Sequence, residues 1–316
     1  MKGRVKLKYA ITGATGHLGQ QIVAAMRPLV ATTELYLGVH TLSKAQVYQQ
    51  QGLHVAAIDY QQPEQLRAFF QDSDVLIYIP SKSHDSYSRV QEFENVLAAV
   101  QQANVHHFLV MGFIADQVNN PFALSAFYGY VPRRLAGSDI NYTIVRNALY
   151  ADPLVPYLPE LIERHNVVYP MADQALSFIS QADSAAAFAK VATTPDLLQR
   201  GRIYTLTQSR AYTMPELATV LSQVSGQPIG YRPVSLQAFS DMYNQNGEGP
   251  MLASMYAGGA RGLLATVSDD YQLIMDRPAQ SLLDYLQTNY QKSSLITENS
   301  KRVHGRDEIP CYNLYQ

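Results

Sequence analysis

Short apolar runs alternate with amphipathic stretches along the first 147 residues of the chain. The apolar runs have the length of buried strands, and the stretches between them place apolar residues on one side at helical spacing. The runs lie at residues 5–11, 34–40, 53–58, 74–79, 105–111 and 141–145, and the helices between them are predicted after residue 16 and at 43–52, 63–70, 89–102 and 124–137, the last interrupted by Pro132. This alternation predicts an α/β fold with a doubly wound parallel sheet, right-handed crossovers and the strand order 3-2-1-4-5-6.

Three glycines stand between the first apolar run and the first helix, in the stretch Gly13-Ala14-Thr15-Gly16-His17-Leu18-Gly19. Gly13 permits a tight turn, Gly16 lets the backbone approach a pyrophosphate, and Gly19 lets the helix pack closely on the strand. The N–H groups at the helix start then face the phosphates, whose charge the helix dipole favours. The spacing is GxxGxxG rather than GxGxxG, and such a triplet also suits a corner without a ligand. Its place at the head of the alternating pattern favours a dinucleotide site.

The pattern beyond residue 147 is shorter and less regular. Residues 151–164 contain three prolines and predict a loop with a short helix, while Thr213-Met-Pro-Glu216 is a capping box that opens a helix. Other predicted helices lie at 181–192, 236–243, within 247–264 and at 281–290, and strands at 201–206 and 228–234. We expect residues 1–147, completed by a strand near 202–207, to form an NAD(P)-binding Rossmann domain, and residues 148–290 a small α+β lobe that builds a substrate pocket. The polar residues 291–316 predict a disordered tail, native or not.

Composition excludes several classes of function. The chain has 316 residues, 47% of them hydrophobic, which is enough for one large domain or two. A net charge of −2 implies no basic face, so no nucleic acid partner is expected. The single Cys311 excludes a disulfide within the chain, and His106 and His107 point to opposite faces of a strand, so no metal site is expected. No apolar run approaches the ~20 residues of a membrane span. We expect a cytoplasmic protein without a signal peptide.

The residues at the carboxyl ends of the strands bear on the cofactor. An acidic residue after the second strand binds the ribose 2′-hydroxyl of NAD(H), whereas a basic one accommodates the 2′-phosphate of NADP(H). The chain has His40 and Lys44 there and no carboxylate between them, so the sequence favours NADP(H), with NAD(H) as the alternative. Asp59 is expected either to contact the ligand or to cap a helix. Lys82 in the following loop would meet a phosphate or face water.

These segments resemble a known family. Ile11–Gly19, Asp59-Tyr60 and Asn141–Asn147 are similar to the NmrA-like atypical short-chain dehydrogenases, and within them to the type 2 NADPH:quinone oxidoreductase group, with further matches at 43–46 and 276–279. The resemblance implies a first lobe that binds NADP(H) and a small second lobe that forms a pocket for a quinone or carbonyl acceptor. By motif position it places residues 13–18 on the pyrophosphate, His40 and Lys44 at the 2′-phosphate, Pro80, Ser81 and Lys82 near the ribose and nicotinamide, and Asn147 and Tyr150 at the nicotinamide end.

The chain departs from ordinary short-chain dehydrogenases at their catalytic residues. Those enzymes pair a serine with Tyr-x-x-x-Lys for acid–base work. Here Met111-Gly112 stands in place of the serine, and the nearest match to the pair is Tyr130 with Arg134. Pro132 strains the helix between them, and arginine stays charged and relays protons poorly. Tyr130 and Arg134 are therefore weak catalytic candidates, and a structural role is favoured for them. The NmrA-like group often lacks the Tyr–Lys pair, so its absence fits the resemblance.

Two functions follow from these features. The first is hydride transfer from NADPH to a quinone or related carbonyl acceptor, which needs no strong protein acid if the two molecules are held within reach. The second is a non-catalytic NADP(H)-binding redox sensor, motivated by the missing catalytic pair. An isomerase or epimerase ranks last because that chemistry generally needs the acid–base tyrosine. The sequence leaves open which of Tyr128, Tyr130 and Tyr150 lines the pocket, and a homodimer is one option for the assembly.

Overall fold

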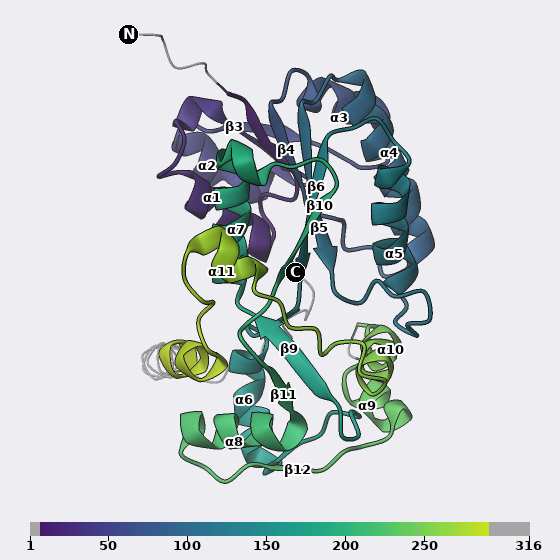
Figure 1. Ribbon diagram of the computed structural model, residues 1–316, viewed down its shortest axis with the longest axis vertical. Helices are drawn as coiled ribbons and strands as arrows, with labels where there is room; N and C mark the ends of the chain where they lie inside the picture. The colour runs from purple at the N-terminus through teal and green to yellow at the C-terminus, as the bar shows by residue number, and fades with distance from the viewer. Residues whose placement is uncertain (1–6, 245, 291–316) are drawn as a thin grey trace.

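A seven-stranded parallel sheet forms the centre of the computed structural model, which describes residues 7–244 and 246–290 (Figure 1). Its strands are β1 (Tyr9–Ile11), β2 (Leu35–Val39), β3 (His54–Ala57), β4 (Val75–Tyr78), β5 (His107–Phe113), β6 (Tyr142–Asn147) and β10 (Arg202–Leu206). Their order is β10-β6-β5-β4-β1-β2-β3, and every pairing is parallel. The predicted order 3-2-1-4-5-6 is confirmed, with β10 added at one edge. The residues before 7 and the predicted tail 291–316 lie outside the described part.

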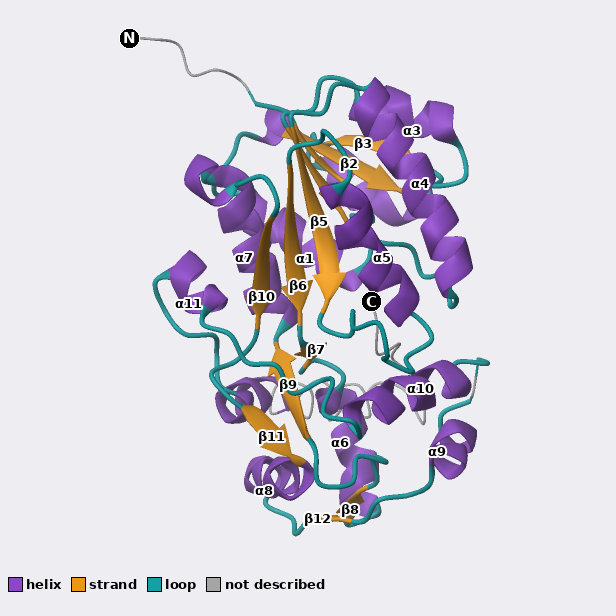
Figure 2. Ribbon diagram, turned by 45° about the vertical axis from the view of Figure 1, so that its right-hand side comes forward, coloured by secondary structure: helices purple, strands orange, loops and turns teal. Residues whose placement is uncertain are grey.

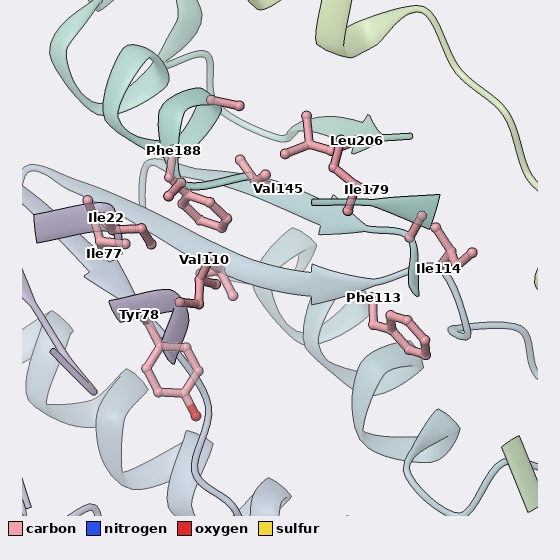
Figure 3. Close-up of a cluster of buried hydrophobic side chains, with 14 of the residues drawn as sticks. Ile22, Ile77, Tyr78, Val110, Phe113, Ile114, Val145, Ile179, Phe188 and Leu206 are labelled. Carbon is pink, nitrogen blue, oxygen red and sulfur yellow. The ribbon is translucent and has the colours of Figure 1, made fainter. Parts of the chain in front are cut away.

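Helices cover both faces of this sheet. Helices α1 (His17–Met26), α2 (Gln46–Gln50) and α7 (Gln181–Thr193) lie on one face, and α3 (Pro63–Phe70), α4 (Ser86–Gln102) and α5 (Ser125–Ala136) lie on the other (Figure 1). Figure 3 shows the apolar layer between α1, α7 and the strands, with Ile22, Val145 and Phe188 among its side chains. Because both faces are covered, the inner strands are mostly apolar, and β1 and β4 are buried along their whole length.

A second part of the chain lies beyond the carboxyl ends of β5, β6 and β10 (Figure 2). It contains a three-stranded sheet of β7 (Leu149–Tyr150), β9 (Ala175–Ile179) and β11 (Ala211–Thr213), and a two-stranded pairing of β8 (Asn166–Val167) with β12 (Gly230–Tyr231). Its helices are α6 (Leu154–Glu163), α8 (Met214–Ser225), α9 (Leu236–Met242) and α10 (Gly249–Gly259). Helix α11 (Asp270–Met275) packs instead against α7 and β10, and residues 282–290 are also helical. The division of the chain near residue 147 stays a prediction.

Two expectations about prolines are corrected by the structure. Helix α5 continues through Pro132, and α6 continues through Pro159 to reach ten residues, longer than the loop with a short helix that was expected. A proline inside a helix removes one N–H and crowds the carbonyl four residues earlier. In α5 the buried side chains of Phe127, Val131 and Leu135 fix the helix on the sheet and offset that cost. Packing therefore outweighs the local penalty at both positions.

Candidate functional site

The glycine turn joins β1 to α1 at the carboxyl edge of the sheet. Gly13 has a φ of +63°, which residues with a Cβ rarely adopt. A Cβ on Gly19 would lie 2.1 Å from the Gly13 carbonyl oxygen, so only glycine allows the helix to start this close to the strand. The N–H of Ala14 donates to the Gly38 carbonyl at 3.2 Å and ties the turn to β2. The tight turn and the close packing predicted from the sequence are both present.

The start of α1 has the features of an anion site. Gly16 occupies the N-cap position, and no side chain there accepts a hydrogen bond from the first turn. The amide groups of this turn therefore point out of the helix start without a side-chain cap, and the helix dipole adds partial positive charge. Thr15 and Gly16 are half-buried beside it, and His17 is exposed. Backbone N–H groups at such a position bind phosphates in many nucleotide-binding proteins.

Thr12 fixes the two strands that flank the turn. Its N–H donates to the Ile77 carbonyl at 3.0 Å, and its hydroxyl accepts from the Ile79 N–H at the same distance. Thr12 carries no signal of this role in the sequence, because a threonine at the end of an apolar run resembles an ordinary strand residue. Strand order reverses between β1 and β4, and ligands of doubly wound sheets bind outside the carboxyl ends of the strands at that point.

Two lysines follow β2 and β4, the strands on either side of β1. Lys44 lies in the 3₁₀ helix Leu42–Ala45 after β2, and Lys82 lies in the loop after β4; both are exposed. Partial burial lowers the pKa of Lys82, and the nearby charge of Lys44 lowers it further, while Glu248 acts in the opposite direction. His40 is exposed at the end of β2, with Nδ1 3.3 Å from the Thr41 hydroxyl. Gathered positive charge of this kind suits a phosphate group.

Two buried charged residues of α4, Arg89 and Glu92, hold the loop after β4 in place. Ser81 and Ser83 both donate to Glu92, the second at 2.8 Å, and Arg89 Nε donates to the Ser83 carbonyl at 2.6 Å. Arg89 and Glu92 are 5% and 7% exposed, which is unusual for charged side chains. Pro80 and Ser81 are half-buried. The sequence does contain a signal for this support, because Arg89 and Glu92 stand among the apolar residues on one side of a predicted helix.

Asp59 and Tyr60 act within the protein in this structure. Asp59 Oδ1 accepts from the Gln61 N–H at 2.8 Å, so its carboxylate caps the turn before α3. The Tyr60 hydroxyl donates to the Ile79 carbonyl at 2.6 Å, and burial raises the pKa of Tyr60 well above its ordinary range. Asn95 on α4 donates to the Tyr60 carbonyl at 2.9 Å. Asp59 and Tyr60 are both half-buried, Tyr60 supports the end of β4, and a ligand contact for either residue stays a prediction.

An aromatic cavity of about 30 Å³ lies at the carboxyl ends of β5 and β6, between the sheet and the second part of the chain. Its polar groups come chiefly from Tyr128, Asn147, Tyr150 and the pair Tyr169 and Tyr256. The remaining lining residues are Met111, Phe113, Ala148, Leu149, Pro153, Leu154, Phe178 and Met255. Figure 2 shows how β9, α6 and α10 approach these strand ends. Apolar walls with few polar groups are typical of sites for small aromatic molecules.

Asn147 organises the polar groups on one side of the cavity. Its side chain is fully buried; Nδ2 donates to the Tyr150 hydroxyl at 3.1 Å, and Oδ1 accepts from the Ser184 hydroxyl at 2.7 Å. Burial raises the pKa of Tyr150 well above its ordinary range, with a smaller contribution from Tyr128. Tyr150 is therefore a neutral phenol near neutral pH. The structure brings Asn147 and Tyr150 together, and their place at the nicotinamide end stays a prediction.

Tyr130 and Arg134 do not line this cavity. The Tyr130 hydroxyl donates to Glu94 of α4 at 2.8 Å, and Arg134 holds the same carboxylate through Nε at 2.9 Å and Nη2 at 3.2 Å. Burial and the hydrogen bond to Glu94 raise the pKa of Tyr130. The pair thus links α5 to α4. Of the three tyrosines left open by the sequence, Tyr128 and Tyr150 line the cavity and Tyr130 does not.

The second part contributes cavity residues that sequence reasoning did not find. Tyr169 follows β8 and Tyr256 lies in α10, and their rings stack with centroids 4.8 Å apart. Phe178 of β9 and Met255 of α10 complete this wall. No local sequence motif marks these positions. Only the packing of α10 and β9 over the sheet brings them together.

The matched segment 276–279 has a structural explanation. Asp183 of α7 accepts from Arg277 at 3.0 Å, from the Gln280 N–H at 2.8 Å and from the Tyr271 hydroxyl at 2.5 Å. Asp183 is buried, and these bonds fasten the segment after α11 to the helix that covers the sheet. The segment therefore anchors the end of the described chain rather than entering the cavity.

Metal and membrane sites are not found in the described residues. Within residues 7–244 and 246–290, no three His, Cys, Asp or Glu side chains gather as a metal site. Over the same ranges no helix has the length and apolar character needed to traverse a lipid bilayer.

Comparison with known proteins supports the family inferred from the motifs. The model of the NmrA-like family matches residues 6–264. The chain is 27% identical over 279 residues to quinone oxidoreductase 2 of Escherichia coli, with 87% of this chain and 96% of the relative covered. A crystal structure of that relative, described as complexed with NADPH, has a TM-score of 0.81 and covers 89% of this chain and 99% of its own.

Two further solved structures are similar over their whole length. One, from Staphylococcus aureus, is described as a nucleoside-diphosphate-sugar epimerase; it is 39% identical with a TM-score of 0.84, covering 89% of this chain and 100% of its own. The other is a triphenylmethane reductase of Citrobacter sp. complexed with NADP(H), 26% identical with a TM-score of 0.81, covering 89% and 100%. The family match spans most of the chain and agrees with the fold, the glycine turn and the strand order. The protein belongs to the NmrA-like family.

Proposed function

We propose that this protein is an NADP(H)-dependent reductase that transfers hydride from bound NADPH to a quinone or related carbonyl acceptor. The observation that carries the proposal is the common location of the glycine turn and the aromatic cavity. Both lie at the carboxyl edge of one sheet, on either side of the point where strand order reverses. A dinucleotide whose pyrophosphate lies on the start of α1 can extend along this edge to the cavity.

The residues present fit the cofactor. The glycine turn, in which Gly13 has a positive φ and Gly19 leaves no room for a Cβ, would hold the pyrophosphate with the amides that follow Gly16. Lys44 and His40 would hold the 2′-phosphate at the end of β2, and Lys82 would add a second cation. The loop of Pro80 and Ser81 would border the ribose, and Asn147 with Tyr150 would border the nicotinamide. When bound, the cofactor supplies the hydride, and the protein supplies position and exclusion of water.

The walls of the cavity suit an aromatic acceptor, but the cavity is too small to hold one in this structure. Its walls are aromatic and apolar, and its volume of about 30 Å³ has room for only one or two waters. Entry of a quinone therefore requires side chains from α6 or α10 to move apart. The names of the relatives support a conjugated acceptor, since quinone and triphenylmethane reductases are among them, as is an NAD(P)H azoreductase of Xenophilus azovorans that is 23% identical over 279 residues.

Titration calorimetry followed by turnover assays tests this proposal. NADPH, NADP⁺, NADH and NAD⁺ would be titrated into the wild type, and NADPH oxidation would then be followed with 1,4-benzoquinone, methyl red and crystal violet. We expect NADPH to bind more tightly than NADH, and 1,4-benzoquinone to be reduced. Tight NADPH binding without oxidation by any of the three acceptors would reject the reductase.

The redox sensor remains a second candidate. The observation that favours it is the closed state of the cavity, in which both polar atoms of Asn147 already have partners within the protein. A sensor requires different affinities for NADPH and NADP⁺, because a ligand shifts a conformational equilibrium only by its differential binding. Equal affinities in the calorimetry, or turnover with a quinone, would exclude it.

Sugar epimerisation fits the site less well than reduction. The similar Staphylococcus aureus structure is described as an epimerase. Acid–base chemistry of that kind needs a proton-transferring pair at the nicotinamide, and the only Tyr-x-x-x-Arg pair in α5 is bound to Glu94 away from the cavity. The apolar walls also offer few partners for the hydroxyl groups of a sugar.

A further inference from the structure

The hydroxyl group of Tyr128 stands apart from the other polar groups of the aromatic cavity. Tyr128 lies in the first turn of α5, lines the cavity and is 8% exposed. Its ring packs on Phe113 with centroids 5.5 Å apart and on Phe127 at 5.1 Å. Its hydroxyl oxygen accepts a hydrogen bond from Arg89 Nη1 at 3.1 Å, and no group of the described chain accepts the Tyr128 proton. That proton remains available to a ligand.

The other cavity tyrosines have their hydroxyl groups engaged differently. Tyr150 accepts from Asn147 Nδ2, and it also shares a hydrogen bond with Ser184, whose own proton goes to Asn147. These three residues form one hydrogen-bonded set within the protein. Tyr169 and Tyr256 share a hydrogen bond with one another, and burial raises the pKa of Tyr169 well above its ordinary range. Tyr128 differs from these tyrosines because a buried cation, Arg89, donates to its oxygen.

Arg89 brings a positive charge to the Tyr128 oxygen. The guanidinium is buried on α4 and is held in place by the Ser83 carbonyl at 2.6 Å. It lies over the rings of Phe127 and Tyr128, at 5.8 Å and 5.9 Å from their centroids. No carboxylate among the described residues lies within ion-pair distance of it, and the nearby Glu92 is occupied by Ser81 and Ser83. A buried cation without a carboxylate partner stabilises an anion that forms beside it.

We propose that Tyr128 is the proton donor to the reduced acceptor, and that Arg89 is a positioning residue that holds the Tyr128 oxygen and stabilises its phenolate. This rests on the reductase proposed above. NADPH gives the quinone two electrons and one proton as hydride, and the quinol needs a second proton. The O–H bond of Tyr128 breaks, the acceptor oxygen takes that proton, and water from solvent restores the phenol after the product leaves. The chain thus replaces the usual Tyr–Lys pair with residues from two different helices.

The charges that face Tyr128 define how its proton transfer should depend on pH. Arg89 donates to it from α4, Glu92 of the same helix and Tyr78 of β4 lie in the same cluster, and Tyr150 faces it from β7. Asp116 and Arg146, which pair with one another at 2.8 Å, line a second cavity together with Tyr128. Burial raises the pKa of both Tyr78 and Tyr150 well above the ordinary range, so these two stay neutral.

The first test compares turnover of wild type, Tyr128→Phe and Tyr204→Phe with NADPH and 1,4-benzoquinone. We expect kcat to fall about 10²-fold in Tyr128→Phe, the usual contribution of a positioned acid, and the slowing of wild type in D2O to disappear. Tyr204 is buried on β10, and its hydroxyl donates to the Leu197 carbonyl at 3.2 Å, so Tyr204→Phe controls for loss of a buried hydroxyl. Wild type without turnover would reject the reductase itself. Wild-type turnover with an unchanged Tyr128→Phe would reject only the proton donor.

The second test observes the phenol without turnover. Protein labelled with [ζ-¹³C]tyrosine would be titrated by NMR without cofactor, and the resonance absent from Tyr128→Phe would be followed in Arg89→Lys and Arg89→Met. We expect its midpoint to move to higher pH in Arg89→Met and less in Arg89→Lys, with the alkaline limb of kcat moving in parallel. A purely structural role for Arg89 would lower stability and leave both midpoints in place. The alkaline limb of kcat in the two Arg89 variants is measured without Tyr128→Phe, so an unmoved limb would overturn the assignment even if Tyr128→Phe failed to fold.

Discussion

The two ends of the proposed cofactor crevice are built in different ways. The glycine turn is local: its conformation comes from a few consecutive residues, and the groups that would bind the ligand are backbone amides. The aromatic cavity is non-local: its walls come from β5, β6, α5, α6, β9 and α10. A site formed by backbone amides accepts few residue types in its turn, and it recognises a phosphate group that many ligands share. A side-chain site can be altered residue by residue, which explains how one fold serves relatives named for quinone, azo and dye reduction.

The largest effect is expected at Gly19 in the glycine turn, where the surrounding backbone leaves no space for a side chain. A Cβ there would lie 2.1 Å from the Gly13 oxygen and 2.9 Å from the Ala14 Cα, and both are backbone atoms that cannot rotate away. Gly19→Ala should lower the free energy of unfolding by about 3 kcal/mol and abolish NADPH binding, as judged by urea denaturation and calorimetry. Gly137→Ala is the control, because its nearest atom would be 3.8 Å away. Normal binding by Gly19→Ala would show that the turn can open.

Asn147 should produce the next largest effect, this time at the side-chain end. Asn147→Ala leaves the hydroxyl groups of Ser184 and Tyr150 without their partner in a buried site. The expected loss is about 2 kcal/mol of unfolding free energy, together with a raised KM for 1,4-benzoquinone and little change in the Kd for NADPH. Asn141→Ala at the exposed start of β6 is the control. If Asn147→Ala weakened the binding of NADPH and of quinone equally, the glycine turn and the aromatic cavity would not act as separate binding regions.

The same contrast explains what the sequence could predict. Each inner strand is built around a contiguous apolar run, and the glycine spacing is a contiguous motif. The strand order of the sheet and the glycine turn could therefore be predicted from local patterns. The strands β7, β8 and β11 have two or three residues each and depend on partners far along the chain. They carry no periodicity of their own, and β9, although apolar, stands among irregular segments. Tyr169 and Tyr256 reach the cavity only because β9 and α10 fold over the sheet, which no local pattern encodes.

Buried charge was the signal that sequence reasoning could have used and did not. Arg89 and Glu92 stand one turn apart in a helix whose apolar stripe faces the sheet, and both are buried. Charged residues in that position need partners, which here are the loop after β4 and Tyr128. The Tyr-x-x-x-Lys pattern drew attention to Tyr130 instead, because spacing within one helix is visible in sequence and a contact between two helices is not.

The lysines at the phosphate end should give a smaller effect that also separates two cofactors. Lys44→Ala should weaken NADPH binding about fivefold and leave NADH unchanged, because Lys44 follows β2 where the 2′-phosphate would lie. Lys82→Ala should weaken both to a similar degree, since Lys82 follows β4. The effects should shrink at high salt because both side chains are exposed. Lys190→Ala, exposed at the end of α7, is the control. If Lys44→Ala lowered the affinity for NADH as much as the affinity for NADPH, Lys44 would not contact the 2′-phosphate.

The smallest effect is expected from Tyr130→Phe, which sharpens the comparison because Tyr130 is only two residues from Tyr128. Its hydroxyl donates to a Glu94 carboxylate that Arg134 still holds at 2.9 Å and 3.2 Å after the change. The hydroxyl is also partly accessible to water, so its loss leaves no buried group unpartnered. We expect a decrease of about 0.5 kcal/mol in the free energy of unfolding and an unchanged kcat with 1,4-benzoquinone. If Tyr130→Phe lost turnover while Tyr128→Phe kept it, the acid would lie on the α4 side of α5, and the spacing motif would have been the better guide than the cavity.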